Sequence, residues 1–228
     1  MIQTHSVEIE ILNQRILSCR ICPRLVAWRE QVALEKRRAF KDQVYWGKPV
    51  PGFGDLNARI FTVGLAPGAH GSNRTGRQFT GDGSGDFLFP ALHRAGLANQ
   101  PFSRDVSDGM LLQDVYTAPV CRCAPPDNKP TSQEMQNCLP YLEAELAILH
   151  PRVLVALGRI AYDIILKIFG VQKTAWKFGH GLEYTLDDQT CLLCSYHPSR
   201  QNTQTGRLTS EMFDSIWKRA KELAGMDG

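Results

Sequence analysis

A continuous apolar run, Arg152-Val-Leu-Val-Ala-Leu157, constrains the fold more than any other stretch of this 228-residue chain. Its length suits a strand, and its lack of alternation predicts burial on both faces of a sheet. Residues 158–169 follow with helical apolar spacing, and Gly170 is expected to end that helix. A buried strand leading into a helix is the repeating unit of a parallel sheet covered by helices on both sides.

The same spacing rules predict the other elements. Further strands are expected at 59–63, 111–122 and 191–196, and helices at 7–17, 24–44, 85–95, 131–150 and from about 209 onward. Pro119 is expected to mark a strand end or a sheet edge, and Pro140 to bend or interrupt its helix. Residues 46–55 are predicted to form a loop, and residues 175–188 a hairpin-like stretch. Together these elements predict a single domain over residues 1–228, a three-layer α/β/α sandwich with a central, mostly parallel four-stranded sheet.

Composition and charge exclude some classes of protein. Apolar residues make up 43% of the chain, but no run is long enough to cross a bilayer. The first residues lack the basic-then-apolar pattern of a secretory signal, so a cytoplasmic location is expected. A net charge of +3 does not by itself imply a polyanionic partner. Residues 36–38 with Lys41 are predicted to be a solvated basic helix face, whereas Arg200 and Arg207 lie in a polar loop suited to phosphate contact.

Seven cysteines, an odd number in a reducing compartment, do not indicate a disulfide framework. Cys19 and Cys22 form a CxxC pair, and Cys123 and Cys138 stand on either side of a polar stretch. Four such thiolates could hold zinc or a four-iron cluster, and the spacing leaves both open. The other three are predicted to be buried core thiols: Cys121, Cys191 and Cys194.

A glycine-rich segment, residues 64–82, connects the apolar stretch 59–63 to the helix expected at 85–95. Such a loop brings backbone amides close to a ligand and directs a helix N-terminus toward it. In parallel sheets ligands bind at the carboxyl ends of the strands. Three loops emerge there, 64–82, 119–131 and 197–208, and we expect the functional site between them.

Four stretches in this order resemble one known family. They are Gly64-Leu-Ala-Pro-Gly68, residues 74–82, residues 123–130, and residues 197–209. They are similar to the iron–sulfur uracil-DNA glycosylases and, within that superfamily, to the fifth family, called type B. The resemblance implies a uracil-DNA glycosylase-like fold and a structural [4Fe–4S] cluster. Its ligands would be Cys19, Cys22, Cys123 and Cys138, and the cluster would tie an N-terminal helical segment, about residues 1–45, to the loop after the second strand.

The implied reaction is the first step of base-excision repair. A monofunctional glycosylase hydrolyses the N-glycosidic bond of a uracil flipped out of DNA and leaves an abasic site. The resemblance assigns catalysis to His197, which donates to the departing base, and to Asp82 and Asn128, which position or polarise the water. The base-binding residues it implies are Gly64, Leu65, Ala66, Pro67, Gly68 and Phe79, on whose ring the base stacks. Arg200, Gln201 and Asn202 would enter the gap in the duplex, and Arg207 would meet phosphate.

Two departures from the wider superfamily affect this expectation. Relatives carry an acidic or polar residue at the position of Leu65 or Ala66, and these apolar side chains cannot activate water. Pro119 stands where several relatives have an asparagine that reads the uracil edge. A pocket with fewer fixed donors should discriminate less sharply. We therefore expect activity on uracil and, more weakly, on hypoxanthine and xanthine.

The expected partner is double-stranded DNA, and also single-stranded DNA, containing uracil or another deaminated base. A monomer associated with the nucleoid is expected, without a membrane partner, a diffusible cofactor or a divalent metal. One alternative is a non-catalytic iron–sulfur or zinc protein that binds damaged DNA. A second, a nucleotide-binding enzyme, is weakened because neither GxxxxGK[ST] nor GxGxxG occurs in the chain.

Overall fold

Four parallel strands form the centre of the fold in the computed structural model, which describes residues 2–226. They are β2 (Ile60–Gly64), β3 (Val115–Pro119), β4 (Val153–Leu157) and β6 (Cys191–Ser195). Two short antiparallel strands, β1 (Phe53–Gly54) and β5 (Glu183–Thr185), extend the sheet to the order β1-β3-β2-β4-β6-β5. The mostly parallel central sheet is confirmed, and the two edge strands, which lie in the stretches predicted as a loop and a hairpin, are additions to it.

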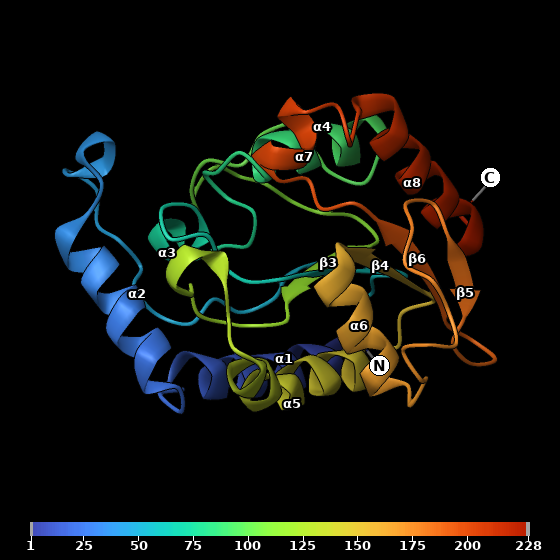
Figure 1. The fold of residues 1–228 in the computed structure, drawn as a ribbon, viewed down its shortest axis with the longest axis horizontal. Coiled ribbons are helices and arrows are strands. Elements are labelled where there is room, and N and C mark those ends of the chain that lie inside the picture. Colours follow the sequence, from blue (N-terminus) through green and yellow to red (C-terminus); the bar gives the residue numbers. More distant parts are fainter. Residues whose placement is uncertain (1, 227–228) are drawn as a thin grey trace.

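Helices cover both faces of this sheet (Figure 1). One layer contains α1 (Ile2–Leu17), α5 (Ser132–Leu149) and α6 (Arg159–Ile168), and the other contains α4 (Gly85–Arg94) and α8 (Ser210–Leu223). Alternate strand residues serve the two layers: Phe61 packs with the first cluster of buried side chains and Ile60 with the second. All residues of β2, β3 and β4 are buried, as the continuous apolar run at 153–157 predicts. The three-layer α/β/α sandwich is therefore confirmed.

Both prolines singled out in the sequence lie within regular elements. Pro119 is the last residue of β3 and pairs with Gly64, so it marks the strand end and not a sheet edge, because β1 and β2 flank β3. Thr131 and Glu134 form the predicted capping box of α5. That helix continues through Pro140, so the predicted interruption is wrong. Pro140 lies on the exposed side of α5, where water can satisfy the carbonyl freed by the missing N–H.

The second helix is shorter than its sequence pattern predicts. α2 (Pro23–Glu35) ends before residue 44 because Lys36 leaves the helical conformation, with φ +53° and ψ +156°, while its N–H still bonds to the Val32 carbonyl at 3.0 Å. The chain then turns into a short 3-10 helix, η1 (Arg38–Phe40). The basic residues 36–41 therefore lie beyond the end of α2 and not on its face.

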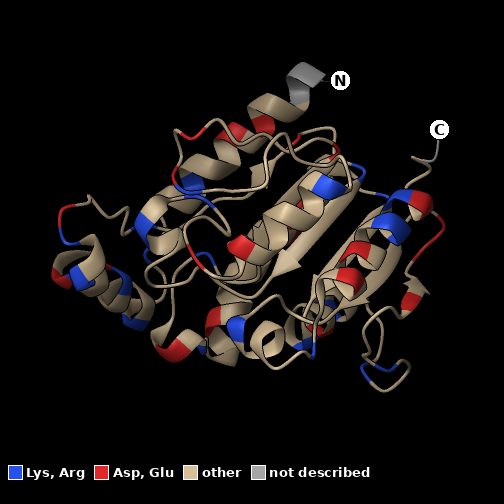
Figure 2. Ribbon diagram, turned by 90° about the horizontal axis from the view of Figure 1, so that it is seen from above, with Lys and Arg blue, Asp and Glu red and all other residues tan. Residues whose placement is uncertain are grey.

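Charged residues of both signs are interspersed over the ribbon, in keeping with the small net charge (Figure 2). Within residues 2–226, no helix combines the length and apolarity that crossing a bilayer requires. Three short helices complete the structure: α3 (Ser72–Thr75), the 3-10 helix η2 (Pro126–Asn128), and α7 (Arg200–Gln204).

Candidate active site

A cavity of about 690 Å³ lies where the three loops at the carboxyl ends of the strands meet. Ten predicted site residues line it: Gly64, Leu65, Ala66, Gly68, Phe79, Asp82, Asn128, His197, Arg200 and Gln201. Three others do not: Pro67 is buried, Asn202 donates to the His197 carbonyl at 2.8 Å, and the Arg207 guanidinium lies 4.6 Å from the Tyr196 ring centroid. The structure thus brings together all three predicted catalytic side chains.

Asp82 is fixed at the start of α4. Its Oδ1 accepts hydrogen bonds from the backbone N–H groups of Ser84 and Gly85, at 3.0 and 3.1 Å. Its Oδ2 faces the glycine turn, and a Cβ at Gly68 would lie 3.1 Å from it. Burial raises the pKa of Asp82, while the two backbone donors and Arg200 oppose that shift. One oxygen of a firmly held carboxyl group is thus left without a protein donor in the described part of the chain.

His197 follows β6 and lies beside Phe79, with ring centroids 6.3 Å apart. Burial lowers the pKa of His197 to about 4, so its imidazole is neutral at pH 7. A neutral imidazole donates one hydrogen bond and accepts another. His197 can therefore donate to a ligand without carrying a positive charge.

Phe79 adopts an uncommon backbone conformation for a residue with a side chain, with φ +52°. Its ring lies against Gly64, where a Cβ would come within 2.9 Å of the ring Cζ. Strain of this kind persists where surrounding structure holds it, often at functional sites. The result is an aromatic ring lining the cavity at the end of β2.

Asn128 and Arg200 are exposed residues of the cavity lining. Asn128 ends η2 with φ +56°, next to Asp127 at φ +53°. Arg200 opens α7 and packs over Gly83, where a Cβ would lie 2.5 Å from its Nε. Both are therefore accessible to a large ligand that covers the cavity mouth.

Several lining residues were not expected from the sequence: Arg37, Phe40, Ala69, His70, Gly71, Ser72, Gln78, Gly81, Gly83, Ser84, Asp127 and Ser199. His70 Nδ1 lies 3.1 Å from the Tyr45 hydroxyl, and burial, with Arg37 and Arg74 nearby, lowers the His70 pKa. Gln78 is 2% exposed, and its Nε2 has no hydrogen-bond partner in the described structure. His70 and Gln78 lie within the glycine-rich segment, so their position offered a signal, whereas Arg37 and Phe40 reach the cavity only through the turn at Lys36.

The four predicted cluster ligands lie together beside α2. Cys22 and Cys123 pack in one buried group. Burial raises the pKa of Cys123 to about 11, the Arg29 guanidinium opposes this, and the thiols of Cys138 and Cys19 lie close enough to raise it further. Two N–H donors point at these sulfurs: Arg29 Nη1 lies 2.8 Å from Cys123 Sγ, and Asn137 Nδ2 lies 3.3 Å from Cys22 Sγ.

This donor set suits a sulfur-bridged cluster. Hydrogen bonds to ligand sulfurs are typical of iron–sulfur sites, where they tune and hold the thiolates. Across residues 2–226, no three or more His, Cys, Asp or Glu side chains lie close enough together to form a metal-binding group. The feature of this site that fits a cluster is the pair of N–H donors directed at the Cys123 and Cys22 sulfurs.

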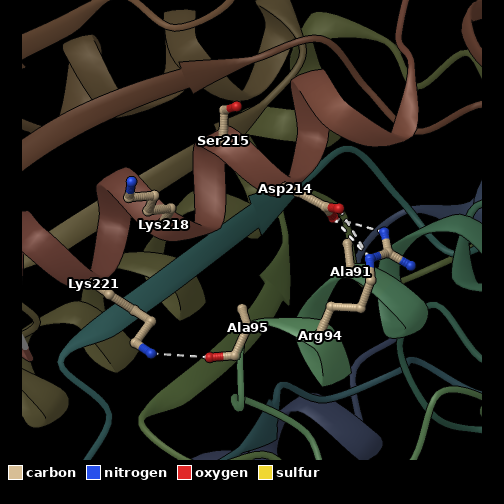
Figure 3. A pocket seen from close by; sticks show the side chains of 7 residues that line it. All are labelled: Ala91, Arg94, Ala95, Asp214, Ser215, Lys218 and Lys221. Carbon is tan, nitrogen blue, oxygen red and sulfur yellow. Dashed lines mark hydrogen bonds and ion pairs between the residues drawn. The ribbon is translucent and has the colours of Figure 1, made fainter.

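Two other hollows contain no predicted site residue. One, of about 400 Å³, lies between α4 and α8, where Arg94 pairs with Asp214 and the Lys221 ammonium donates to the Ala95 carbonyl (Figure 3). The other, of about 880 Å³, is lined from α5, α6 and the turn at 187–190. The cavity at the strand ends, in contrast, contains the predicted catalytic side chains Asp82, Asn128 and His197 together with the ring of Phe79.

Comparison with known proteins identifies the family of this chain. The Uracil DNA glycosylase superfamily model matches residues 51–221. The type-5 uracil-DNA glycosylase of Thermus thermophilus is 56% identical over 95% of this chain and 99% of its own length. The type-5 enzyme of Pyrobaculum aerophilum is 46% identical over 92% and 91%, and the type-4 enzyme of Archaeoglobus fulgidus 31% identical over 77% and 82%. The chain therefore belongs to the uracil-DNA glycosylase superfamily and, within it, to the type-5 uracil-DNA glycosylases.

Proposed function

We propose that this protein hydrolyses the N-glycosidic bond of uracil in DNA and leaves an abasic site for base-excision repair. One observation carries this proposal: Asp82, a neutral His197 and the ring of Phe79 line one cavity, in a chain that belongs to a glycosylase family. The target bond is hidden in stacked DNA, so the nucleotide must be flipped into this cavity. Relatives named as glycosylases over nearly the whole chain favour this enzyme over a non-catalytic damage-binding protein.

The proposed chemistry separates charge between the sugar and the base. As the bond breaks, the sugar becomes cationic and the base gains negative charge. His197, neutral and within the cavity, donates its ring N–H to the base oxygen where that charge grows. Asp82 keeps its second oxygen available to orient the attacking water and to stabilise the cationic sugar. The amide of Asn128, on the exposed lining, holds the water from the other side.

Base recognition is proposed to rest mainly on shape and stacking. Phe79 supplies the stacking surface, and the loop from Gly64 to Gly68 supplies backbone and apolar side chains. Leu65 and Ala66 line the cavity but offer no polar group to read the base, and Pro119 is buried at the end of β3. Because few donors are fixed, we propose that hypoxanthine and xanthine are also released, more slowly than uracil.

Cys19, Cys22, Cys123 and Cys138 are proposed to hold a structural [4Fe–4S] cluster. The support is a cluster of thiols with two N–H donors directed at the sulfurs. Bound there, the cluster supplies a covalent link between the N-terminal segment, about residues 1–45, and the segment after β3. Asn128 lies in the chain between two of the four ligands, so this link would help to fix its position.

The proposed substrate is DNA, double-stranded and also single-stranded. Arg200 and Gln201, exposed at the cavity, are proposed to enter the gap left by the flipped nucleotide. Asn202 is proposed to support them by its bond to the His197 carbonyl, and Arg207 to meet phosphate. We propose one domain that acts as a monomer on nucleoid DNA in the cytoplasm.

Base release measured on defined duplexes tests this function. Pure protein is incubated with a duplex carrying one uracil, and abasic sites are then cleaved with alkali. Strand cleavage that depends on both uracil and protein is expected; intact strands together with tight binding would instead favour the damage-binding alternative. The same assay with hypoxanthine and xanthine tests the broad pocket, which full uracil release without any hypoxanthine release would contradict.

A further inference from the structure

The basic segment, residues 36–41, borders the cavity although its sequence suggests a solvated helix face. It carries Lys36, Arg37, Arg38 and Lys41. None of these four side chains forms an ion pair within residues 2–226, and Arg37, Arg38 and Lys41 are exposed. Cationic side chains that have no ion-pair partner in the described structure and lie beside a proposed DNA site are candidates to bind the phosphates of that DNA.

The turn at Lys36, where φ is positive, directs this segment toward the cavity. Beyond the turn, Arg37 and Phe40 both contribute to the cavity lining. The Arg37 N–H donates to the Tyr45 hydroxyl at 3.3 Å, and that hydroxyl meets His70 Nδ1 at 3.1 Å. The backbone of the segment is thus connected to the glycine-rich loop.

Arg74 fixes the segment further. Its guanidinium lies 4.1 Å from the Phe40 ring centroid, and its Nη1 donates to the Gln43 side chain at 2.7 Å. The same group donates to the carbonyls of His70 and Gly81, at 2.7 and 3.0 Å. Since Arg74 is only 8% exposed, these bonds are sheltered from water. These contacts therefore fix the basic segment in place along one side of the cavity.

Arg200 borders the same cavity from α7. The glycine-rich loop lies between α7 and the segment after α2 (Figure 1). A nucleotide flipped into this cavity stays attached to its strand by a phosphate on each side. Arg200 and the basic segment place positive charge on two separate sides of the cavity, one for each of these two phosphates.

We propose that the basic segment binds DNA backbone phosphates on the side of the flipped nucleotide away from Arg200, with Arg37 nearest the cavity and Arg38 and Lys41 farther along the strand. This inference rests on the proposed function, since it takes DNA as the ligand. It adds a second phosphate-binding wall to the one formed by α7.

The salt dependence of binding tests the second wall. The probe is a duplex carrying a tetrahydrofuran abasic analogue, which the protein cannot hydrolyse. Each lost phosphate contact should lower the slope of log K against log salt by about 0.9. The double variant R37Q/R38Q should therefore lose roughly one to two units of slope and bind about tenfold or more weakly at low salt. An unchanged slope in R37Q/R38Q overturns the inference.

The matched control removes equal charge elsewhere. K167Q/K218Q changes two exposed lysines that form no ion pair within residues 2–226 and do not line the cavity, one in α6 and one beside the hollow in Figure 3. Its slope should stay within about half a unit of the unsubstituted protein, and an equal loss in both double variants would show a nonspecific charge effect and overturn the inference. Uracil release is measured in parallel. If the unsubstituted protein releases uracil but R37Q/R38Q has an unchanged salt slope, this inference alone is wrong. If the unsubstituted protein releases no uracil, the proposed function is wrong.

Discussion

At the scale of single residues, burial acts on the two central ionisable groups in opposite directions. It raises the pKa of Asp82 and lowers that of His197 to about 4, because it disfavours the charged form of each. For His197 nothing in the described structure opposes the shift, so the ring is a neutral donor at pH 7. For Asp82 two backbone N–H groups and Arg200 favour the carboxylate. The cavity thus combines an uncharged imidazole donor with a buried carboxyl group that two backbone N–H groups hold in place.

Asp82 and Asn128 are predicted to position the water together. D82N keeps an acceptor for the Ser84 and Gly85 amides while it removes the charge, so the fold should survive. We expect D82N and N128A each to slow single-turnover uracil release by on the order of 100-fold, with little change in affinity for the abasic-analogue duplex. Full release rates in both variants would contradict this account of water activation.

His197 is predicted to act on the departing base and not on DNA affinity. H197A should reduce the release rate by about 100-fold or more, the effect of removing a donor from a site of growing negative charge. Binding to the abasic-analogue duplex should change by less than about threefold, because that ligand has no base to contact. Equal losses in rate and affinity would instead assign His197 to DNA binding. S195A, a change in a buried β6 residue outside the cavity lining, controls for disturbance of the strand end.

The same histidine should make the fold sensitive to acid. Its pKa is about 4 in the folded protein and about 6.5 when unfolded, so the unfolded chain binds the extra proton between these values. Stability is therefore full above pH 6.5 and falls as the pH drops toward 4, by about 3 kcal/mol from this group. In H197Q, the free energy of unfolding measured with urea should fall less steeply between pH 6.5 and 4 than it does in the unsubstituted protein. A slope identical to that of the unsubstituted protein would show that the ring is accessible to protons in the folded state.

At the scale of elements, a buried ion pair joins α5 to the chain just beyond β3. Arg122 Nη1 lies 3.0 Å from Glu145 Oε1, with the two side chains 1% and 0% exposed, and the Tyr116 hydroxyl donates to the same oxygen at 3.4 Å. R122L should lower the free energy of unfolding by about 3–5 kcal/mol, because it leaves a carboxylate buried without its partner. R122L/E145L should lose less than R122L, since no unpaired charge remains. A double variant less stable than the single one would contradict this explanation, and urea unfolding at neutral pH measures both.

The helices and strands also show which structural features local sequence patterns cannot predict. The apolar run at 153–157 and the capping box at Thr131 depend on neighbours in the chain, and both predictions are confirmed. The end of α2 depends on Lys36 adopting φ +53° and on Arg74 holding Phe40 from a distant loop, which no local spacing reports. Consequently the glycine-rich side of the cavity could be read from sequence motifs, whereas the side formed by Arg37 and Phe40 could not.

At the scale of the whole molecule, the cysteine site and the cavity are joined through α2. Arg29 donates to Cys123 Sγ at 2.8 Å, and its own carbonyl accepts a bond from Asn73 Nδ2 of the glycine-rich loop at 3.2 Å. Asn73 is fully buried, so this bond is protected from water. The proposed cluster would thus anchor α2, and α2 in turn supports the loop and the basic segment.

Removal of one cysteine ligand of the proposed cluster should therefore also affect DNA binding at the cavity. C123S should lose most of its iron and brown colour, melt at a lower temperature, and bind the abasic-analogue duplex more weakly, because α2 and the basic segment lose their anchor. C191S is the matched control: Cys191 begins β6, outside the cysteine site, and that variant should keep its iron. Metal analysis, visible absorbance and thermal unfolding measure the two variants side by side. A colourless native protein containing zinc would refute the iron–sulfur cluster, and a C123S variant that loses iron but keeps full DNA affinity would refute the coupling through α2.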